Sequence, residues 1–176
     1  LRIQCREVVK HEPDSALARI MEPRAASPER RMKTIEALAK AGIPVGVSVS
    51  PMIPFINEPE LEHVLERARE AGATSAFATV LRLPWEVNPL FQQWLAAHFP
   101  KRAARVMARV HEMRGGRDND PRFRSRMTGQ GVWAQLLAQR FEKATQRLGL
   151  RTERRPLDLS AFRRAAPAPS AQASLF

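Results

Sequence analysis

The sequence has little of the cysteine and histidine on which many metal and catalytic sites depend. Its 176 residues include one Cys, no Tyr and four His. The single thiol, Cys5, excludes an internal disulfide framework and a thiolate-rich metal site built by this chain alone. The histidines lack metal-ligand spacing, and the sequence holds no Ser-His-Asp order, no phosphate-cradling glycine loop and no HExxH pair. Composition therefore points to no particular catalytic class.

Long apolar runs are also scarce. The longest, residues 43–56, is interrupted by three prolines, whereas a membrane-spanning helix needs about 20 apolar residues. No apolar signal-peptide segment follows the charges of the first residues. We therefore expect no membrane segment and a cytoplasmic location. Because the first residue is Leu1 rather than Met, we also expect the chain to begin partway through a longer protein.

Basic residues, in contrast, are abundant and unevenly placed. Residues 1–100 hold 12 Lys and Arg against 12 Asp and Glu, whereas residues 101–176 hold 17 against 6, so the net charge of +11 lies in the second part. Such a charge fits either a solvated basic surface or an anionic partner such as nucleic acid, since clustered Arg attracts phosphate. Three of these cations repeat at helical spacing and share one face: Arg102, Arg105 and Arg109. Further candidates for phosphate contact are Arg114, Arg122, Arg124 and Arg126.

The first half of the chain alternates helical and strand patterns. The expected elements are, in order, a helix over 14–21, a helix from Ser27-Pro28 to Gly42, a strand over 45–49, a helix capped by Asn57 and closed by Gly72, and a strand over 75–83. The buried stripe of the last helix is expected to be Leu61, Val64, Leu65 and Ala68. Ala41-Gly42 and Ala71-Gly72 each precede a strand, 30 residues apart. That spacing is the length of one α/β unit, and two units in series require right-handed crossovers onto a parallel sheet.

Beyond Leu83 the strand pattern stops and helical patterns replace it. We expect helices from Asn88-Pro89 onward, over 101–113 and over 131–148. The apolar set of the third is expected to be Val132, Leu136, Leu137, Phe141 and Leu148. The chain thus divides into an N-terminal segment of uncertain structure (1–13), an α/β part (14–87), a basic helical region (88–149) and a flexible tail (150–176). Because a small parallel sheet has an open edge, we expect the α/β part to be a piece of a barrel.

Reactive loops of parallel α/β proteins follow the carboxyl ends of strands. Here those loops are 51–57 and 82–86, and Glu22 with Arg24 takes the equivalent place if a strand precedes Asp14. Arg24 can hold a carboxylate through a two-bond fork. The alternative is that Glu22 and Arg24 pair to fix a loop. Likewise, the charged turn 115–120 either binds an anion or is a solvated loop.

Several motifs, in this order, resemble radical S-adenosylmethionine (SAM) proteins, and most closely the spore-photoproduct-lyase-like or DNA repair photolyase-like group. The resemblance covers about residues 15–150. The motifs are Met21-Glu22-Pro23-Arg24-Ala25-Ala26-Ser27-Pro28, Ala41-Gly42-Ile43-Pro44-Val45 with Pro51-Met52-Ile53-Pro54, Val80-Leu81-Arg82-Leu83-Pro84, Trp94-Leu95-Ala96-Ala97-His98-Phe99-Pro100 and Met113-Arg114-Gly115-Gly116.

This resemblance implies a fold, cofactors and a site. Such proteins form a partial (β/α)6 barrel of the TIM-barrel type and bind a 4Fe-4S cluster through a Cys-x3-Cys-x2-Cys loop. SAM supplies the remaining iron ligands, and its reductive cleavage gives a 5′-deoxyadenosyl radical that abstracts hydrogen from the substrate. The residues expected to face SAM are Glu22, Arg24, Ser48, Pro51, Ile53 and Asn57. Those expected on the substrate side are Arg82 and Glu86.

The sequence also departs from the family pattern. The cluster loop is absent, the polar and Pro-broken residues 1–13 do not form the strand expected there, and Phe55 stands where the resemblance places Gly. The fold expected is therefore the C-terminal portion of a partial (β/α)6 barrel with a helical cap and a disordered tail. A separate N-terminal half would carry the cluster motif, and this chain alone would be inactive. The alternative is a stand-alone basic module that binds nucleic acid.

Overall fold

The centre of the molecule is a parallel sheet packed against helices. The computed structural model describes residues 5–8, 16–123, 125–153, 160 and 163. Within this part, three parallel strands run in chain order: β1 (Cys5–Val8), β2 (Val45–Met52) and β3 (Ser75–Val80). The chain therefore has a mixed α/β fold. The helices are α1 (Ala16–Met21), α2 (Pro28–Lys40), η1 (Glu58–Glu60), α3 (Leu61–Glu70), α4 (Val87–His98), α5 (Pro100–Met113), α6 (Ser125–Thr128) and α7 (Gly131–Leu148).

Strand β1 was not expected, and the sequence-based view of residues 1–13 was wrong at this point. Cys5 pairs with Val45 and Val8 pairs with Ser48, so β1 lies parallel to β2 along its first half. A strand of four residues is too short to show a period-two pattern in sequence. Asp14, where the first helix was expected to start, lies outside the described residues. So does the start of the N-terminal segment.

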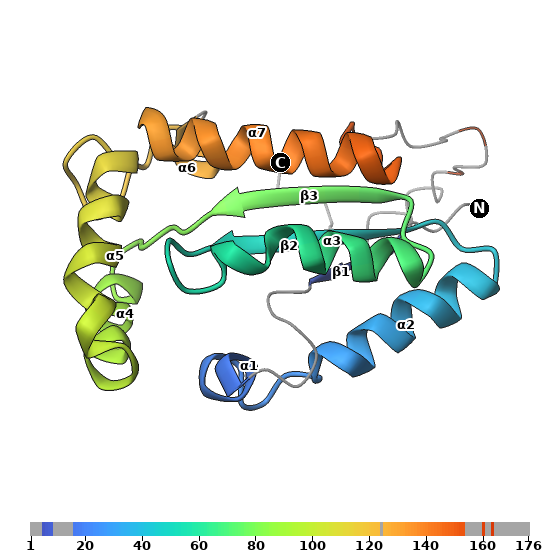
Figure 1. The fold of residues 1–176 in the computed structure, drawn as a ribbon, viewed down its shortest axis with the longest axis horizontal. Coiled ribbons are helices and arrows are strands. Elements are labelled where there is room, and N and C mark those ends of the chain that lie inside the picture. Colours follow the sequence, from blue (N-terminus) through green and yellow to red (C-terminus); the bar gives the residue numbers. More distant parts are fainter. Residues whose placement is uncertain (1–4, 9–15, 124, 154–159, 161–162, 164–176) are drawn as a thin grey trace, which may run out of the picture.

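Helices α2, α3 and α7 form one layer against the sheet, since α3 contacts both α2 and α7 (Figure 1). The expected stripe of α3 is confirmed, because Leu61, Val64, Leu65 and Ala68 are all buried. They pack with the alternate valines of β2, which are Val45, Val47 and Val49. None of the helices in the described ranges combines the length and apolarity that a membrane crossing requires.

The ends of these helices have the local causes that the sequence indicates. The Ser27 hydroxyl accepts a hydrogen bond of 3.3 Å from the Arg30 amide, and Pro28 occupies the first turn of α2. Gly42 (φ +73°) and Gly72 (φ +101°) turn the chain out of α2 and α3 and into the following strands. The repeat of 30 residues thus corresponds to two consecutive parallel α/β units.

After β3, helices α4 and α5 lie across the carboxyl end of the sheet (Figure 1). Arg114 follows α5 and is 1% exposed. Its guanidinium donates to the carbonyls of Ser125 (3.1 Å), Arg126 (2.9 Å) and Leu81. The buried Arg114 side chain therefore links the end of β3 to helix α6.

Helix α7 then runs back along the sheet. Leu137 is buried as expected, but Val132 and Leu136 are 66% and 53% exposed, so this part of the expected apolar set was wrong. The two lie off the packed stripe, which follows Ala134, Leu137 and Ala144 at helical spacing. Beyond α7, Arg151 pairs in parallel with Ser75. Leu150 is buried, so the first residues of the expected tail belong to the fold, while most of that tail lies outside the described residues.

Candidate functional site at the carboxyl ends of the strands

Two loops follow the carboxyl ends of β2 and β3, and each contains an aromatic residue in a conformation that favours glycine. Among the described residues, Phe55 (φ 60°) and Trp85 (φ 42°) are the non-glycine residues with positive φ. Such conformations cost about 1–3 kcal/mol and cluster at functional positions. The structure explains why the resemblance places glycine at Phe55, because glycine adopts this φ without strain. Trp85 is 87% exposed and is not a core residue.

Asn57 holds the loop after β2 together. Its side chain is buried, with Oδ1 accepting from the Ile53 amide at 2.7 Å and Nδ2 donating to the Pro51 carbonyl at 2.9 Å. The expected side-chain cap was wrong, since Asn57 makes no capping hydrogen bond to η1. Ile53 is also buried. Among the SAM candidates of this loop, Pro51 is the partly exposed one.

Ser48 lies on β2 within the sheet. Its side chain is nearly buried and its hydroxyl donates to the Ser50 hydroxyl at 3.2 Å. Phe77 of β3 pairs with Ser48 in register and is 37% exposed. Ser48 and Phe77 therefore occupy the same face of the sheet, since residues in parallel register point to one side.

Glu22 and Arg24 do not pair with each other. The Glu22 carboxylate pairs with Arg31 of α2 at 3.0 Å, and both side chains are largely buried. Arg24 is exposed and makes no ion pair within the described part of the chain. Glu22 also lines a cavity of about 400 Å³ with its neighbours Ala18, Arg19, Pro23, Ala25 and Ser27. The segment thus combines a structural ion pair with one available cation.

The three arginines of α5 converge on Phe55. The Arg105 guanidinium carbon lies 3.9 Å from the centre of the phenyl ring, and that of Arg109 lies 5.9 Å from it. Arg102 donates to the Phe55 carbonyl at 3.1 Å. Arg109 also pairs with Glu112. These contacts confirm that the three arginines share one helix face, and they bring that face to the carboxyl end of β2.

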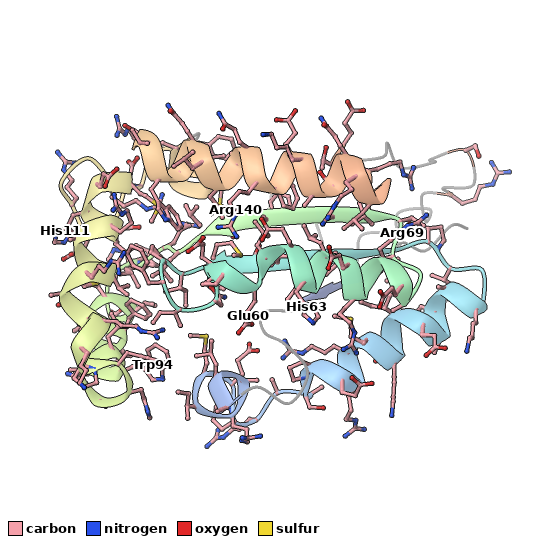
Figure 2. The ribbon with its side chains drawn as sticks, in the orientation of Figure 1. Glu60, His63, Arg69, Trp94, His111 and Arg140 are labelled. Carbon is pink, nitrogen blue, oxygen red and sulfur yellow. The ribbon has the colours of Figure 1, made fainter. Side chains whose placement is uncertain are left out.

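The residues expected on the substrate side differ in exposure. Arg82 is partly buried, its Nη1 lies 3.9 Å from the Met127 sulfur, and its Nε has no partner in the described residues. Glu86 is exposed and precedes α4. Trp94 of α4, labelled in Figure 2, is a packing residue. It contacts Phe91 and donates to the Ile20 carbonyl at 3.2 Å.

Sequence reasoning missed the central place of Phe55 and the burial of Arg114. The available signal for Phe55 was its departure from the glycine of the resembled motif. For Arg114, the following Gly115-Gly116 pair indicated only a turn, because burial of a cation arises from tertiary packing.

Compared with models of known protein families, with curated proteins and with solved structures, the chain matches none of them. The resemblance to radical SAM proteins therefore rests on the motifs. A 4Fe-4S cluster takes three or four thiolates, and this chain has one. Within the described ranges, no three His, Cys, Asp or Glu side chains gather to hold a metal ion. The residues of this chain do not fit such a cluster.

Proposed function

We propose that the chain is a part of a radical SAM barrel whose carboxyl end binds SAM, and that the iron–sulfur cluster is held by residues outside it. The observation that carries this proposal is the winding of the sheet. The parallel strands β1, β2 and β3 follow one another in chain order. Doubly wound sheets reverse direction and place helices on both faces, whereas barrels wind in one direction with helices outside. The single layer of α2, α3 and α7 favours the barrel.

Two groups of this chain are complementary to SAM. Arg24 is exposed and carries no partner within the described ranges, so its guanidinium suits the SAM carboxylate. The backbone around Pro51, held by Asn57, suits the edge of the adenine ring. In the resembled proteins SAM supplies the radical, while the residues here would bind and orient it. The substrate would lie towards Arg82 and Glu86.

The test is the affinity of the purified chain for SAM, measured by equilibrium dialysis. Arg24→Gln should weaken binding about tenfold, the loss expected for one charge-assisted hydrogen bond. Arg30→Gln is the matched control, because Arg30 is an exposed cation of α2 whose loss changes net charge equally. No measurable binding, or equal affinities of the two variants, would refute the SAM site.

A second candidate function is nucleic-acid binding, and Arg105 favours it. Arg105 stacks on Phe55 and has no carboxylate partner within the described part of the chain, so its donors are available to phosphate. Arg102 lies on the same face. The affinity for DNA or RNA should fall steeply with salt. The slope of log affinity against log salt concentration should become shallower in Arg105→Glu, and much less so in Lys143→Glu on α7. No binding at low salt would dismiss this function.

A further inference from the structure

The turn after α5 is shaped by two consecutive glycines. Gly115 (φ 65°) and Gly116 (φ 79°) both adopt positive φ, and the Gly116 amide donates to the His111 carbonyl at 2.8 Å to close the helix. A Cβ atom added at either glycine would meet no atom within 4 Å. The turn therefore has open space beside its backbone.

Beside Gly115 is a cavity of about 360 Å³ with a basic lining. It is lined by Arg114, Gly115, Arg117, Asp120, Pro121 and Arg122. Asp120 is the acidic group in this set, and Arg122 engages it through its amide (3.1 Å), Nε (2.9 Å) and Nη2 (3.2 Å). These hydrogen bonds hold the pKa of Asp120 well below its usual range. The lining thus has one carboxylate for three guanidinium groups, and this carboxylate is paired with Arg122.

The other two guanidinium groups lack a carboxylate at ion-pair distance in the described residues. Arg114 is 1% exposed. Its Nη atoms donate to carbonyl oxygens, and its Nε has no partner in the described residues. Burial lowers the pKa of Arg114, the charge of Asp120 opposes this shift, and the charge of Arg82 adds to it. Arg117 is exposed and makes no ion pair within these ranges. A buried positive charge without a paired carboxylate is costly unless an anion accompanies it.

We propose that this cavity, between α5 and α6, binds a phosphate group through Arg114, Arg117 and the backbone of Gly115. A phosphate carries up to two negative charges, which matches the two cations of the lining that have no ion pair in the described residues. Its oxygens accept the paired donors of guanidinium groups, and glycines let it approach the main chain. This proposal does not rest on the proposed SAM site, because none of the residues assigned to SAM or its substrate lines the cavity.

The experiment is an NMR titration of the isotope-labelled chain, following the Arg114 Nε–H and the Gly115 and Gly116 amides. The first probe is inorganic phosphate, added against sodium chloride of equal ionic strength. These resonances should shift and saturate with phosphate and not with chloride. Arg117→Gln should weaken the affinity about tenfold, because one charge-assisted hydrogen bond is lost. Arg117 makes no hydrogen bond or ion pair in the described residues, so the variant is expected to fold.

Arg30→Gln is the control, since it removes the same charge from α2. Equal phosphate affinity in Arg117→Gln and Arg30→Gln, or shifts that do not saturate, would overturn the proposal. The second probe is an oligothymidylate without terminal phosphate. Tighter binding of inorganic phosphate at these resonances supports a small phosphorylated ligand, and tighter binding of the oligonucleotide at the same resonances supports a nucleic-acid backbone.

Discussion

Phe55 shows how one side chain changes what a strand-end loop can accept. Glycine at a positive φ leaves the backbone open to a flat ligand, whereas the phenyl ring fills that space. In this chain the Arg105 guanidinium stacks on the ring, with its central carbon 3.9 Å from the ring centre. The loop after β2 is therefore partly occupied by the protein's own side chains, and SAM would approach it from the side of Pro51.

At the same scale, Asn57 is the residue whose loss should open this loop. Asn57→Ala should lower the free energy of unfolding by about 2 kcal/mol, because it removes two hydrogen bonds and leaves the buried Ile53 amide without its partner. Urea denaturation measures this loss. Gln93→Ala, at an exposed amide of α4, should change stability by less than about 0.5 kcal/mol. A similar loss in both variants would contradict the role of Asn57.

Among the elements, the two Ala-Gly turns look alike in sequence but differ in packing. A Cβ atom at Gly72 would lie 2.6 Å from the Ala39 Cβ of α2, whereas one at Gly42 would meet nothing within 4 Å. Gly72→Ala should therefore cost about 2–3 kcal/mol of stability, from strain and overpacking together. Gly42→Ala should cost about 1 kcal/mol from strain alone. Equal losses in urea denaturation would show that the α2 contact does not limit the turn.

Helix α7 is fastened to α3 by Arg140, which lies between them (Figure 2). Its Nε and Nη2 donate to the Glu62 carboxylate at 2.8 and 2.7 Å, which lowers the pKa of Glu62 below its ordinary value of 4.5. A carboxylate with a lowered pKa in the folded state stabilises the fold above its ordinary pKa. This contribution is lost as pH falls through the lowered value.

Arg140→Met should thus lower the free energy of unfolding by about 1 kcal/mol at neutral pH, a value reduced for partial exposure of the pair. The difference from the unmodified chain should shrink as pH falls below 4.5. Arg147→Met is the matched control, because Arg147 is 62% exposed and makes one contact with Glu66. A difference that stays constant down to acidic pH would contradict the pairing with Glu62.

The elements also show what could be predicted from sequence. The α3 stripe and the Ser27 cap are local patterns, so the sequence alone predicts them correctly. β1 and the exposure of Val132 were missed because pairing with β2 and the orientation of α7 are set by tertiary packing. At the site, the helix face of the α5 arginines was predictable from spacing, but their convergence on Phe55 was not. That contact joins residues about 50 positions apart, which no local pattern encodes.

At the scale of the whole molecule, the sheet and the basic helices meet at one end. The carboxyl ends of β2 and β3 lead into loops that carry Phe55 and Trp85, and α5 lies across them (Figure 1). A barrel segment would place its ligand at this end. Arg114 follows α5 and donates to the Leu81 carbonyl after β3, so the proposed phosphate site also lies near this end of the sheet.

The most direct test of the central claim is an NMR map of where SAM binds on the isotope-labelled chain. At millimolar SAM, the backbone amides of the non-proline residues in 52–57 and 82–86 should shift, because these loops follow the carboxyl ends of β2 and β3. The Arg24 amide should shift with them. Shifts confined to the turns at 41–44 and 71–74, at the amino ends of β2 and β3, would contradict the account. So would a spectrum that SAM leaves unchanged.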